Sequence, residues 1–203
     1  RCGIRALDLY DIKKLRQKVM DRLELAVNSG ELSDSDRADL MPEIEKFLKD
    51  SANIFPMVKD TFSMLHEMVD NNKNILLEGA QGTMLDVNHG TYPFVTSSSP
   101  SSGGISTGLG LPLTKVNRIV GIFKAYTTRV GKGPFPTELL DSDGEKLRDL
   151  GKEYGATTDR PRRCGWFDAV EARYSVQING FTEIILTKLD ILDHFDKIKI
   201  CTG

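Results

Sequence analysis

The sequence is poor in the residues that hold metals or form disulfide bonds. Its three cysteines, Cys2, Cys164 and Cys201, are odd in number and share no C-x-x-C spacing. It also has only three histidines, which give no support for a zinc cage. This composition predicts reduced thiols in a cytosolic protein instead of a disulfide framework.

Long apolar runs and an excess of charge of one sign are also missing. No stretch approaches the ~18 apolar residues of a membrane-spanning helix, and no signal peptide is visible. The net charge of −2 leaves no basic footprint for nucleic acid. A hydrophobic content of 39% over 203 residues suits an ordinary globular protein with a real core. We therefore expect neither a membrane nor a nucleic acid among its partners.

A phosphate-binding loop is absent as well. No segment fits G-x-x-x-x-G-K-[ST], and no other glycine-lysine loop opens a helix. The four residues Thr187-Lys-Leu-Asp190 are typical of a guanine-reading turn and would by themselves suggest a small regulatory GTPase. The missing loop argues against that class.

Helical periodicity dominates the first third of the chain. Apolar residues recur at spacings of three and four within residues 11–28, with Asp11 as the N-cap. A second helix is expected to run from about Pro42, a favourable first helical residue, to about residue 54. A third carries its apolar face within residues 58–69. We expect a mostly helical insertion at about residues 11–70.

The next stretch looks like a ligand loop. The apolar run Ile75-Leu-Leu77 ends in Glu78-Gly79, which predicts a buried strand that opens into a glycine-rich loop. In parallel α/β sheets, ligands lie at the carboxyl ends of strands. Gln81 offers donors and an acceptor there. The loop at 97–104 is then either a flexible linker or a connection between two ligand-binding segments.

Strands and helices alternate through the rest of the chain. A short helix is expected at 112–118, a strand at 119–130, a helix at 145–153, and a strand at 182–186. Between the last two, Asp168 is a plausible N-cap of a helix that stops at Asn179-Gly180. This alternation predicts the α/β class, with a mainly parallel sheet flanked by helices and a sheet core at about residues 74–203.

The segment from Thr158 to Arg163 concentrates positive charge. It holds three arginines around Pro161, and arginine binds carboxylates and phosphates bidentately. The pattern favours a site for an anionic small molecule. On composition alone, a solvated basic turn is the alternative.

Several ordered blocks of the sequence together resemble the adenylosuccinate synthetase family. They are Glu78-Gly-Ala-Gln-Gly-Thr83, Asp86 with His89-Gly-Thr-Tyr-Pro93, Val95-Thr-Ser-Ser98, Arg129-Val-Gly-Lys-Gly-Pro-Phe-Pro-Thr-Glu138, Thr157-Thr158 with Arg160-Pro-Arg-Arg-Cys-Gly-Trp-Phe-Asp168, and Leu186-Thr-Lys-Leu-Asp190. The resemblance covers nearly the whole chain but only the middle of the family's length. The absence of an initial Met, and the strand just begun at 197–201, also lead us to expect a piece of a longer protein.

The resemblance implies a cytoplasmic homodimeric ligase of purine synthesis. It would join L-aspartate to IMP with GTP as co-substrate and Mg²⁺ as cofactor, giving adenylosuccinate, GDP and phosphate. In the family, the phosphate loop, the catalytic aspartate and histidine, and the magnesium ligands precede the part matched here. We therefore expect no catalytic residue and no metal ligand in this chain, and no activity from it alone. The alternative is a non-catalytic nucleotide-binding fragment or pseudoenzyme.

The resemblance also implies binding roles. IMP would contact Arg1, Gln81, Thr96 and Arg160. Aspartate would contact Val130 and the loop Ala156, Thr157, Thr158, Asp159, Arg160, Pro161 and Arg162. GTP would contact Arg162, Lys188, Leu189 and Asp190, with the Asp190 carboxylate accepting from two guanine donors. Asp159 departs from the family, which usually has glycine there. His66 and His89 are expected to be structural.

Overall fold

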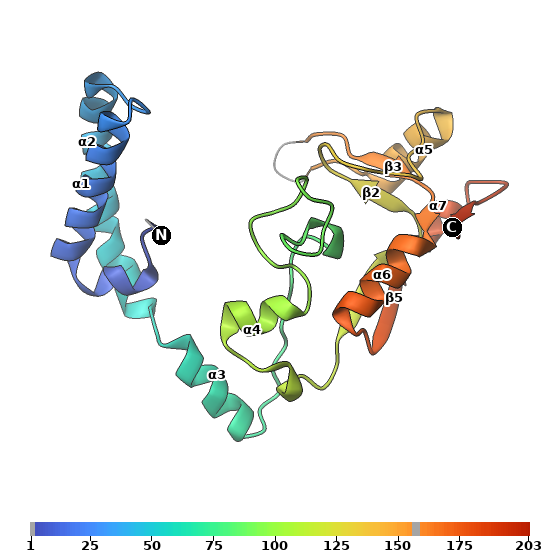
Figure 1. Ribbon diagram of the computed structural model, residues 1–203, viewed down its shortest axis with the longest axis horizontal. Coiled ribbons are helices and arrows are strands. Elements are labelled where there is room, and N and C mark those ends of the chain that lie inside the picture. The colour runs from blue at the N-terminus through green and yellow to red at the C-terminus, as the bar shows by residue number, and fades with distance from the viewer. Residues whose placement is uncertain (1–2, 156–158) are drawn as a thin grey trace. The chain divides into compact units, whose positions relative to one another are not determined.

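The computed structural model describes residues 3–155 and 159–203. The chain divides into two compact units, Arg1–Thr61 and Phe62–Gly203 (Figure 1). Within the described ranges, no helix is both long enough and apolar enough to cross a membrane.

The first unit is built on two helices, α1 (Ile12–Asn28) and α2 (Asp34–Ile54). The carboxylate of Asp11 accepts hydrogen bonds from the amides of Lys13 and Lys14, so the predicted N-cap of α1 is confirmed. Both helices bury residues of one face: Leu15, Leu23 and Ala26 of α1, and Leu48 and Ser51 of α2. The guanidinium of Arg16 pairs with Glu45 and joins the helices at the surface.

The expected start of the second helix at Pro42 is wrong, because α2 begins at Asp34 and Pro42 lies inside it. The reason is a capping box at Ser33. Its hydroxyl oxygen accepts from the amide of Asp36, and the Asp36 carboxylate accepts from the amide of Ser33. The usual capping box has Glu or Gln at this position, and here the shorter Asp side chain accepts the same hydrogen bond from the N-cap amide.

The second unit contains most of α3 and all later elements. Its helices are α3 (Thr61–Asp70), α4 (Gly103–Leu109), α5 (Ser142–Gly151), α6 (Ala169–Asn179) and α7 (Leu189–Leu192), and its strands are β1 (Val120–Lys124), β2 (Thr127–Arg129), β3 (Arg163–Gly165), β4 (Phe167–Asp168), β5 (Glu183–Thr187) and β6 (Ile200–Cys201). β1 pairs with β5, and β4 with β6, in parallel, whereas β2 and β3 are antiparallel. Mainly parallel pairing flanked by helices confirms the α/β class.

The predicted buried strand at Ile75–Leu77 is not formed. Residues 73–80 have no regular secondary structure, and Leu76 is 92% exposed. A strand needs a neighbouring strand for its backbone hydrogen bonds, and no other part of the described chain pairs with this segment. An apolar run by itself therefore did not define the element.

Local signals located the later elements better. The expected strand at 119–130 is divided into β1 and β2 by Ala125 and Tyr126, and the helix expected at 112–118 is only a short 3₁₀ turn, Leu113–Lys115. Asp168 caps α6 by accepting from two backbone amides, and Gly180 ends it at φ +62°. Both ends of α6 are therefore as predicted.

A small core lies between α5, the β2–β3 pair and α7. Its buried members are Tyr126, Leu147, Cys164 and Ile191, with Leu139, Leu150, Leu192 and Phe195 packed around them. Burial raises the pKa of the Cys164 thiol to about 11. Cys164 and Cys201 are free thiols, while Cys2 lies outside the described residues. This core packs against the end of α5, where Lys188 and Arg162 form hydrogen bonds with Gly151 and Glu153.

Candidate functional site

Gln81 adopts an unusual backbone conformation. Its φ is +59°, in the left-handed region that few residues other than glycine occupy, and its side chain is exposed. It lies just before a 3₁₀ turn, Thr83–Leu85. Backbone strain of this kind concentrates at ligand sites, so the conformation agrees with the binding role implied for Gln81.

Asp86 organises the loop that follows Gln81. It is fully buried, and its carboxylate accepts from the hydroxyl of Ser101 (2.6 Å), the amide of Ser101 (3.2 Å) and the amides of Asn88 (2.9 Å) and His89 (3.2 Å). Burial favours the neutral acid, but these hydrogen bonds outweigh it and lower the pKa of Asp86 to about 2. The Asp86 carboxylate therefore links Asn88 and His89, near the start of the loop, to Ser101 at its end.

Helix α6 also forms hydrogen bonds with the loop that follows Gln81. The Asn179 side chain accepts from the amide of Ser102 (2.8 Å) and donates to the Thr83 hydroxyl (2.8 Å). The Tyr174 hydroxyl donates to the carbonyl of His89 (2.7 Å). His89 is thus held through its main chain, while its side chain is exposed.

Arg129 links the segment before Thr96 to the end of β2, next to Val130. Thr96 donates its amide to Leu85 (2.8 Å). The Arg129 guanidinium donates to the Thr91 hydroxyl (2.8 Å) and to the carbonyl of Phe94 (3.1 Å). It therefore links the segment that carries Thr96 to the end of β2, where Val130 follows with 61% of its surface exposed. One residue implied for IMP and one implied for aspartate thus belong to connected segments.

The arginine-rich loop is described from residue 159 on. Asp159 has φ +51° and donates its amide to the carbonyl of Gly155 (2.8 Å), while Gly155 donates to the carbonyl of Arg160 (2.9 Å). Arg160 and Pro161 are exposed. The implied binding residues Arg1, Ala156, Thr157 and Thr158 lie outside the described residues.

Next to this loop lies a buried carboxylate that the sequence did not reveal. Glu153 is 2% exposed and receives hydrogen bonds from Lys124 Nζ (2.8 Å to each oxygen), the Tyr126 hydroxyl (2.7 Å) and Arg162 Nη1 (2.9 Å). Burial opposes ionisation, but bonds from Lys124, Tyr126 and Arg162 outweigh it and lower the pKa of Glu153. Burial, with the adjacent Glu153 charge, raises the pKa of Tyr126. The phenol therefore stays a donor.

Arg162 is only partly satisfied by these contacts. Its Nη1 is bound to Glu153, while its buried Nε finds no hydrogen-bond partner within the described ranges. A buried donor without a partner is uncommon in folded proteins. The rest of the Arg162 side chain is not fully buried, since 32% of its surface is exposed.

Lys188, Leu189 and Asp190 lie at the start of α7. Lys188 has φ +63°, and its Nζ donates to the carbonyl of Gly151 (2.8 Å) at the end of α5. Leu189 is 54% exposed, and Asp190 is also exposed. Because Glu153 follows Gly151 closely, the end of α5 anchors both Lys188 and Arg162. Lys188 and Arg162, two of the residues implied for GTP, are therefore both hydrogen-bonded to the chain at the end of α5.

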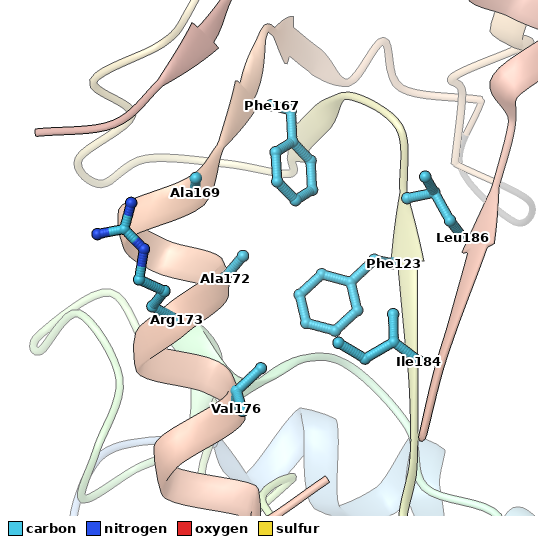
Figure 2. Close-up of a pocket in the computed structure, with 8 residues that line it drawn as sticks. All are labelled: Phe123, Phe167, Ala169, Ala172, Arg173, Val176, Ile184 and Leu186. Atoms are coloured by element: carbon cyan, nitrogen blue, oxygen red, sulfur yellow. The ribbon is translucent and has the colours of Figure 1, made fainter. Parts of the chain in front are cut away.

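Two apolar cavities lie apart from most of these residues. The first, of about 350 Å³, opens between α6 and the strands β1 and β5, where Phe123, Val176 and Ile184 face one another (Figure 2). The second, of about 180 Å³, includes Leu189 among its lining residues, with Trp166 and Leu186. Nucleotide sites need several convergent polar groups, which these linings lack. The loops, and not the cavities, form the candidate site.

No magnesium site is apparent in the part of the chain that the structure describes. Residues 3–155 and 159–203 include no group of three or more His, Cys, Asp or Glu side chains placed to hold a metal ion. The residues present here therefore do not fit a metal centre.

The residues that the sequence analysis missed are Asp86, Lys124, Tyr126 and Glu153. Asp86 left a partial signal, because an aspartate two residues before Asn88 suits a turn in which the side chain accepts local amides. Glu153 left none, since Tyr126, Lys124 and Arg162 lie 27, 29 and 9 positions away in sequence, too far for a local motif.

Comparisons with known proteins agree on one family. The family model described as adenylosuccinate synthetase matches residues 1–203. The adenylosuccinate synthetase of Acidothermus cellulolyticus is 50% identical over 205 aligned positions, which cover 100% of this chain and 48% of that protein. The chain thus spans about half the length of the curated relatives it matches.

Two solved structures resemble the fold. The fully ligated adenylosuccinate synthetase from Plasmodium falciparum has a TM-score of 0.90 and 38% identity, covering 98% of this chain and 46% of that one. The succinoaminodeoxyadenylate synthetase of cyanophage S-2L, bound to dGMP and to dATP as an energy donor, has a TM-score of 0.53 and 30% identity, covering 71% of this chain and 47% of that one.

Proposed function

This chain belongs to the adenylosuccinate synthetase family, and from that premise we propose that it is the substrate-positioning part of a ligase that joins L-aspartate to IMP. GTP supplies the energy, and adenylosuccinate, GDP and phosphate are the products. In this proposal the full-length protein, meaning one of the relatives' length that contains this sequence, works in the cytoplasm as a homodimer. Arg1 then reaches the nucleotide of the neighbouring subunit.

The reaction has two steps. IMP loses its N1 proton, and O6 of the purine attacks the γ-phosphorus of GTP while the bond to GDP breaks. This turns a poor leaving group into a phosphate ester. The amine of aspartate then attacks C6, the C6–O bond breaks, and phosphate leaves while the amine loses a proton. Both steps bring anions together, so binding and charge neutralisation are the work that this part of the protein performs.

Arg162 and Arg160 carry the proposed contacts to anions. Arg162 is held by Glu153 while 32% of its side-chain surface is exposed, and Arg160, two positions earlier, is exposed as well. Guanidinium groups in such positions bind the carboxylates of aspartate bidentately. The loop residues Ala156, Thr157, Thr158, Asp159 and Pro161, together with Val130, complete the proposed aspartate site. Gln81 and Thr96 orient IMP.

The proposed GTP contacts are Arg162, Lys188, Leu189 and Asp190. The exposed Asp190 accepts from N1–H and the exocyclic amine of guanine, and the Lys188 stem lies along the base. Mg²⁺ is a cofactor of the proposed reaction, but the described residues do not fit a metal centre. The metal ligands, the phosphate loop and the proton-transfer groups belong, in this proposal, to the rest of the full-length protein.

The bond between Arg162 and the buried Glu153 carboxylate is the single observation that best supports this proposal. An arginine that is already fixed by a buried carboxylate, and whose side chain is still 32% exposed, is preorganised for an anion. A solvated basic turn would instead place all of its guanidinium donors in water. The anchored guanidinium therefore favours a binding site over the solvated turn.

The test is adenylosuccinate formation by the full-length protein with IMP, L-aspartate, GTP and Mg²⁺. We expect turnover of about 1 per second or more. Omitting aspartate should abolish product while leaving the protein folded. No product from a folded full-length protein at saturating substrates would refute the proposal.

A non-catalytic nucleotide-binding protein is the second candidate. It would use the same nucleotide contacts, among them the exposed Asp190, without the chemical steps. The 203-residue chain alone should form no adenylosuccinate under the same conditions. If titration calorimetry shows that the full-length protein binds IMP and GTP but gives no product, this second candidate replaces the ligase.

A further inference from the structure

Glu153 connects three separate parts of the second unit. Its carboxylate is met by Lys124 from the end of β1, by Tyr126 from the turn before β2, and by Arg162 from the arginine-rich loop. With 2% of its surface exposed, it has almost no contact with water. A buried carboxylate needs such partners, because unpaired it would be strongly destabilising.

Arg162 is fixed by its main chain as well as by its side chain. Its amide donates to the carbonyl of Glu153 (2.9 Å), and its own carbonyl accepts from Nε of Arg148 (2.9 Å). An arginine side chain loses much rotamer freedom when it is ordered. In Arg162 the contact with Glu153 already restricts the side chain. Ligand binding therefore costs less conformational entropy.

The charges of this cluster do not cancel. Two cations, Lys124 and Arg162, meet one carboxylate, Glu153, and the Tyr126 hydroxyl is neutral. One positive charge therefore remains. Lys124 lies 2.8 Å from both carboxylate oxygens and can balance Glu153 by itself. The charge that remains for a ligand is then that of Arg162, whose side chain is 32% exposed.

We propose that Glu153 is a positioning residue, which orients Arg162 for the anionic substrates while Lys124 neutralises the Glu153 carboxylate. The inference rests on the proposed function and deepens it. Glu153 itself touches no substrate. Its contribution is to set the direction of the Arg162 guanidinium, and its loss should weaken the binding of substrates that use Arg162.

The test is steady-state kinetics of the full-length protein with Glu153→Gln. A glutamine keeps the size of the side chain but removes the charge that holds Arg162. The loss of a charge-assisted hydrogen bond corresponds to about tenfold in affinity or more. We expect KM for aspartate and for GTP to rise by about that factor, and KM for IMP to change less than about twofold.

Glu138→Gln is the matched control. Glu138 accepts from Nε and Nη2 of Arg163, the residue next to Arg162, and its side chain is 19% exposed. A general loosening of the loop would raise KM for aspartate alike in both variants, and that result would overturn the inference. A fall in kcat with every KM unchanged would also overturn it. That pattern reports a loss of folded protein and shows no effect of Glu153 on substrate binding.

A second variant keeps the inference testable if Glu153→Gln does not fold. Tyr126→Phe removes one donor from Glu153 and leaves the aromatic ring in the core. It should raise KM for aspartate in the same direction by a smaller factor, and an unchanged KM would contradict the inference. Failure of this inference can be told apart from failure of the proposed function. In the second case, the unaltered protein would make no adenylosuccinate.

Discussion

The hydroxyl of Tyr126 occupies the space that a side chain at Gly151 would need. A β-carbon built on Gly151 would overlap this hydroxyl, and it would also lie 3.2 Å from Cγ of Glu153. Gly151 is the last residue of α5, and its carbonyl accepts from Lys188. The close approach of helix α5 to Tyr126 therefore requires glycine here, and it brings Glu153 within reach of the phenol.

Gly151→Ala should lower the free energy of unfolding by about 1–3 kcal/mol, the usual cost of inserting a methyl group into a packed site. Combining it with Tyr126→Phe should recover part of that loss, since the phenylalanine ring leaves the space free. Urea unfolding of the two single variants and the double variant measures the coupling. Gly103→Ala, where the nearest atom lies 3.9 Å away, is the control. Strictly additive effects would contradict the overlap.

Asp86 should make the stability of the protein depend on acid pH. Its folded pKa of about 2 lies below the ordinary value of about 3.9, so its contribution is fully present above about pH 5 and is lost as pH falls toward 2. The contribution is roughly 2–3 kcal/mol at neutral pH, and about half of it should remain at pH 3.

Asp86→Asn tests this pH dependence. The variant should be destabilised at pH 6, and the difference from the unaltered protein should shrink at pH 3, as measured by urea unfolding at both values. Glu183→Gln, in an exposed pair with Arg118, should show a much smaller dependence on pH because solvent screens that pair. A deficit of Asp86→Asn that is equal at both pH values would argue against an ionised Asp86.

Asp159 holds a backbone conformation that suits glycine better than most residues. At φ +51°, a β-branched side chain is strained by about 1–2 kcal/mol, whereas Asp tolerates the left-handed region. We expect Asp159→Val to destabilise the protein by about that amount and Asp159→Gly to stay within about 1 kcal/mol of the original. Thermal unfolding of both variants provides the comparison. Equal losses in both would show that the conformation is not what matters.

The same position should affect substrate affinity. Removing the Asp159 carboxylate from the arginine-rich loop takes a negative charge away from a proposed anion site. In the full-length protein, KM for aspartate should fall in Asp159→Gly and in Asp159→Asn alike. A change seen in only one of them would point to the backbone and not to the charge.

Asp190→Asn should change nucleotide specificity in the full-length protein. A carboxylate accepts from both guanine donors, whereas an asparagine presents one acceptor and an amine that opposes a donor. Leaving one donor unpaired costs roughly 1–3 kcal/mol, or about 5- to 150-fold in the specificity constant for GTP. Use of xanthosine triphosphate should improve in relative terms, since its 2-oxo group accepts from the new amide.

Kinetics with GTP and xanthosine triphosphate on both proteins separate base reading from a local structural role. If Asp190 only supports the start of α7, both nucleotides will suffer alike and the ratio of the two specificity constants will not move. KM for IMP and for aspartate should stay within about twofold, which serves as the internal control.

Helix ends could be predicted where the deciding residues are close neighbours in sequence. Asp11 and Asp168 accept from amides two and three positions ahead, so a short segment contains the whole interaction. The α/β class followed from alternation along the chain in the same way. The start of α2 was missed although it is equally local, because Asp36 completes its capping box instead of the usual Glu or Gln.

The sequence by itself determined the family, the α/β class and the kinds of side chain in the ligand loops, because each of these depends on residue identity and order. Only the tertiary structure decided which of those side chains are already engaged. Among residues 3–155 and 159–203, no strand pairs with residues 75–77, Glu153 is buried against Lys124, and Arg162 is bound through Nη1 while its Nε has no partner. Such contacts join residues that are far apart in the chain, so they exist only once the elements have packed.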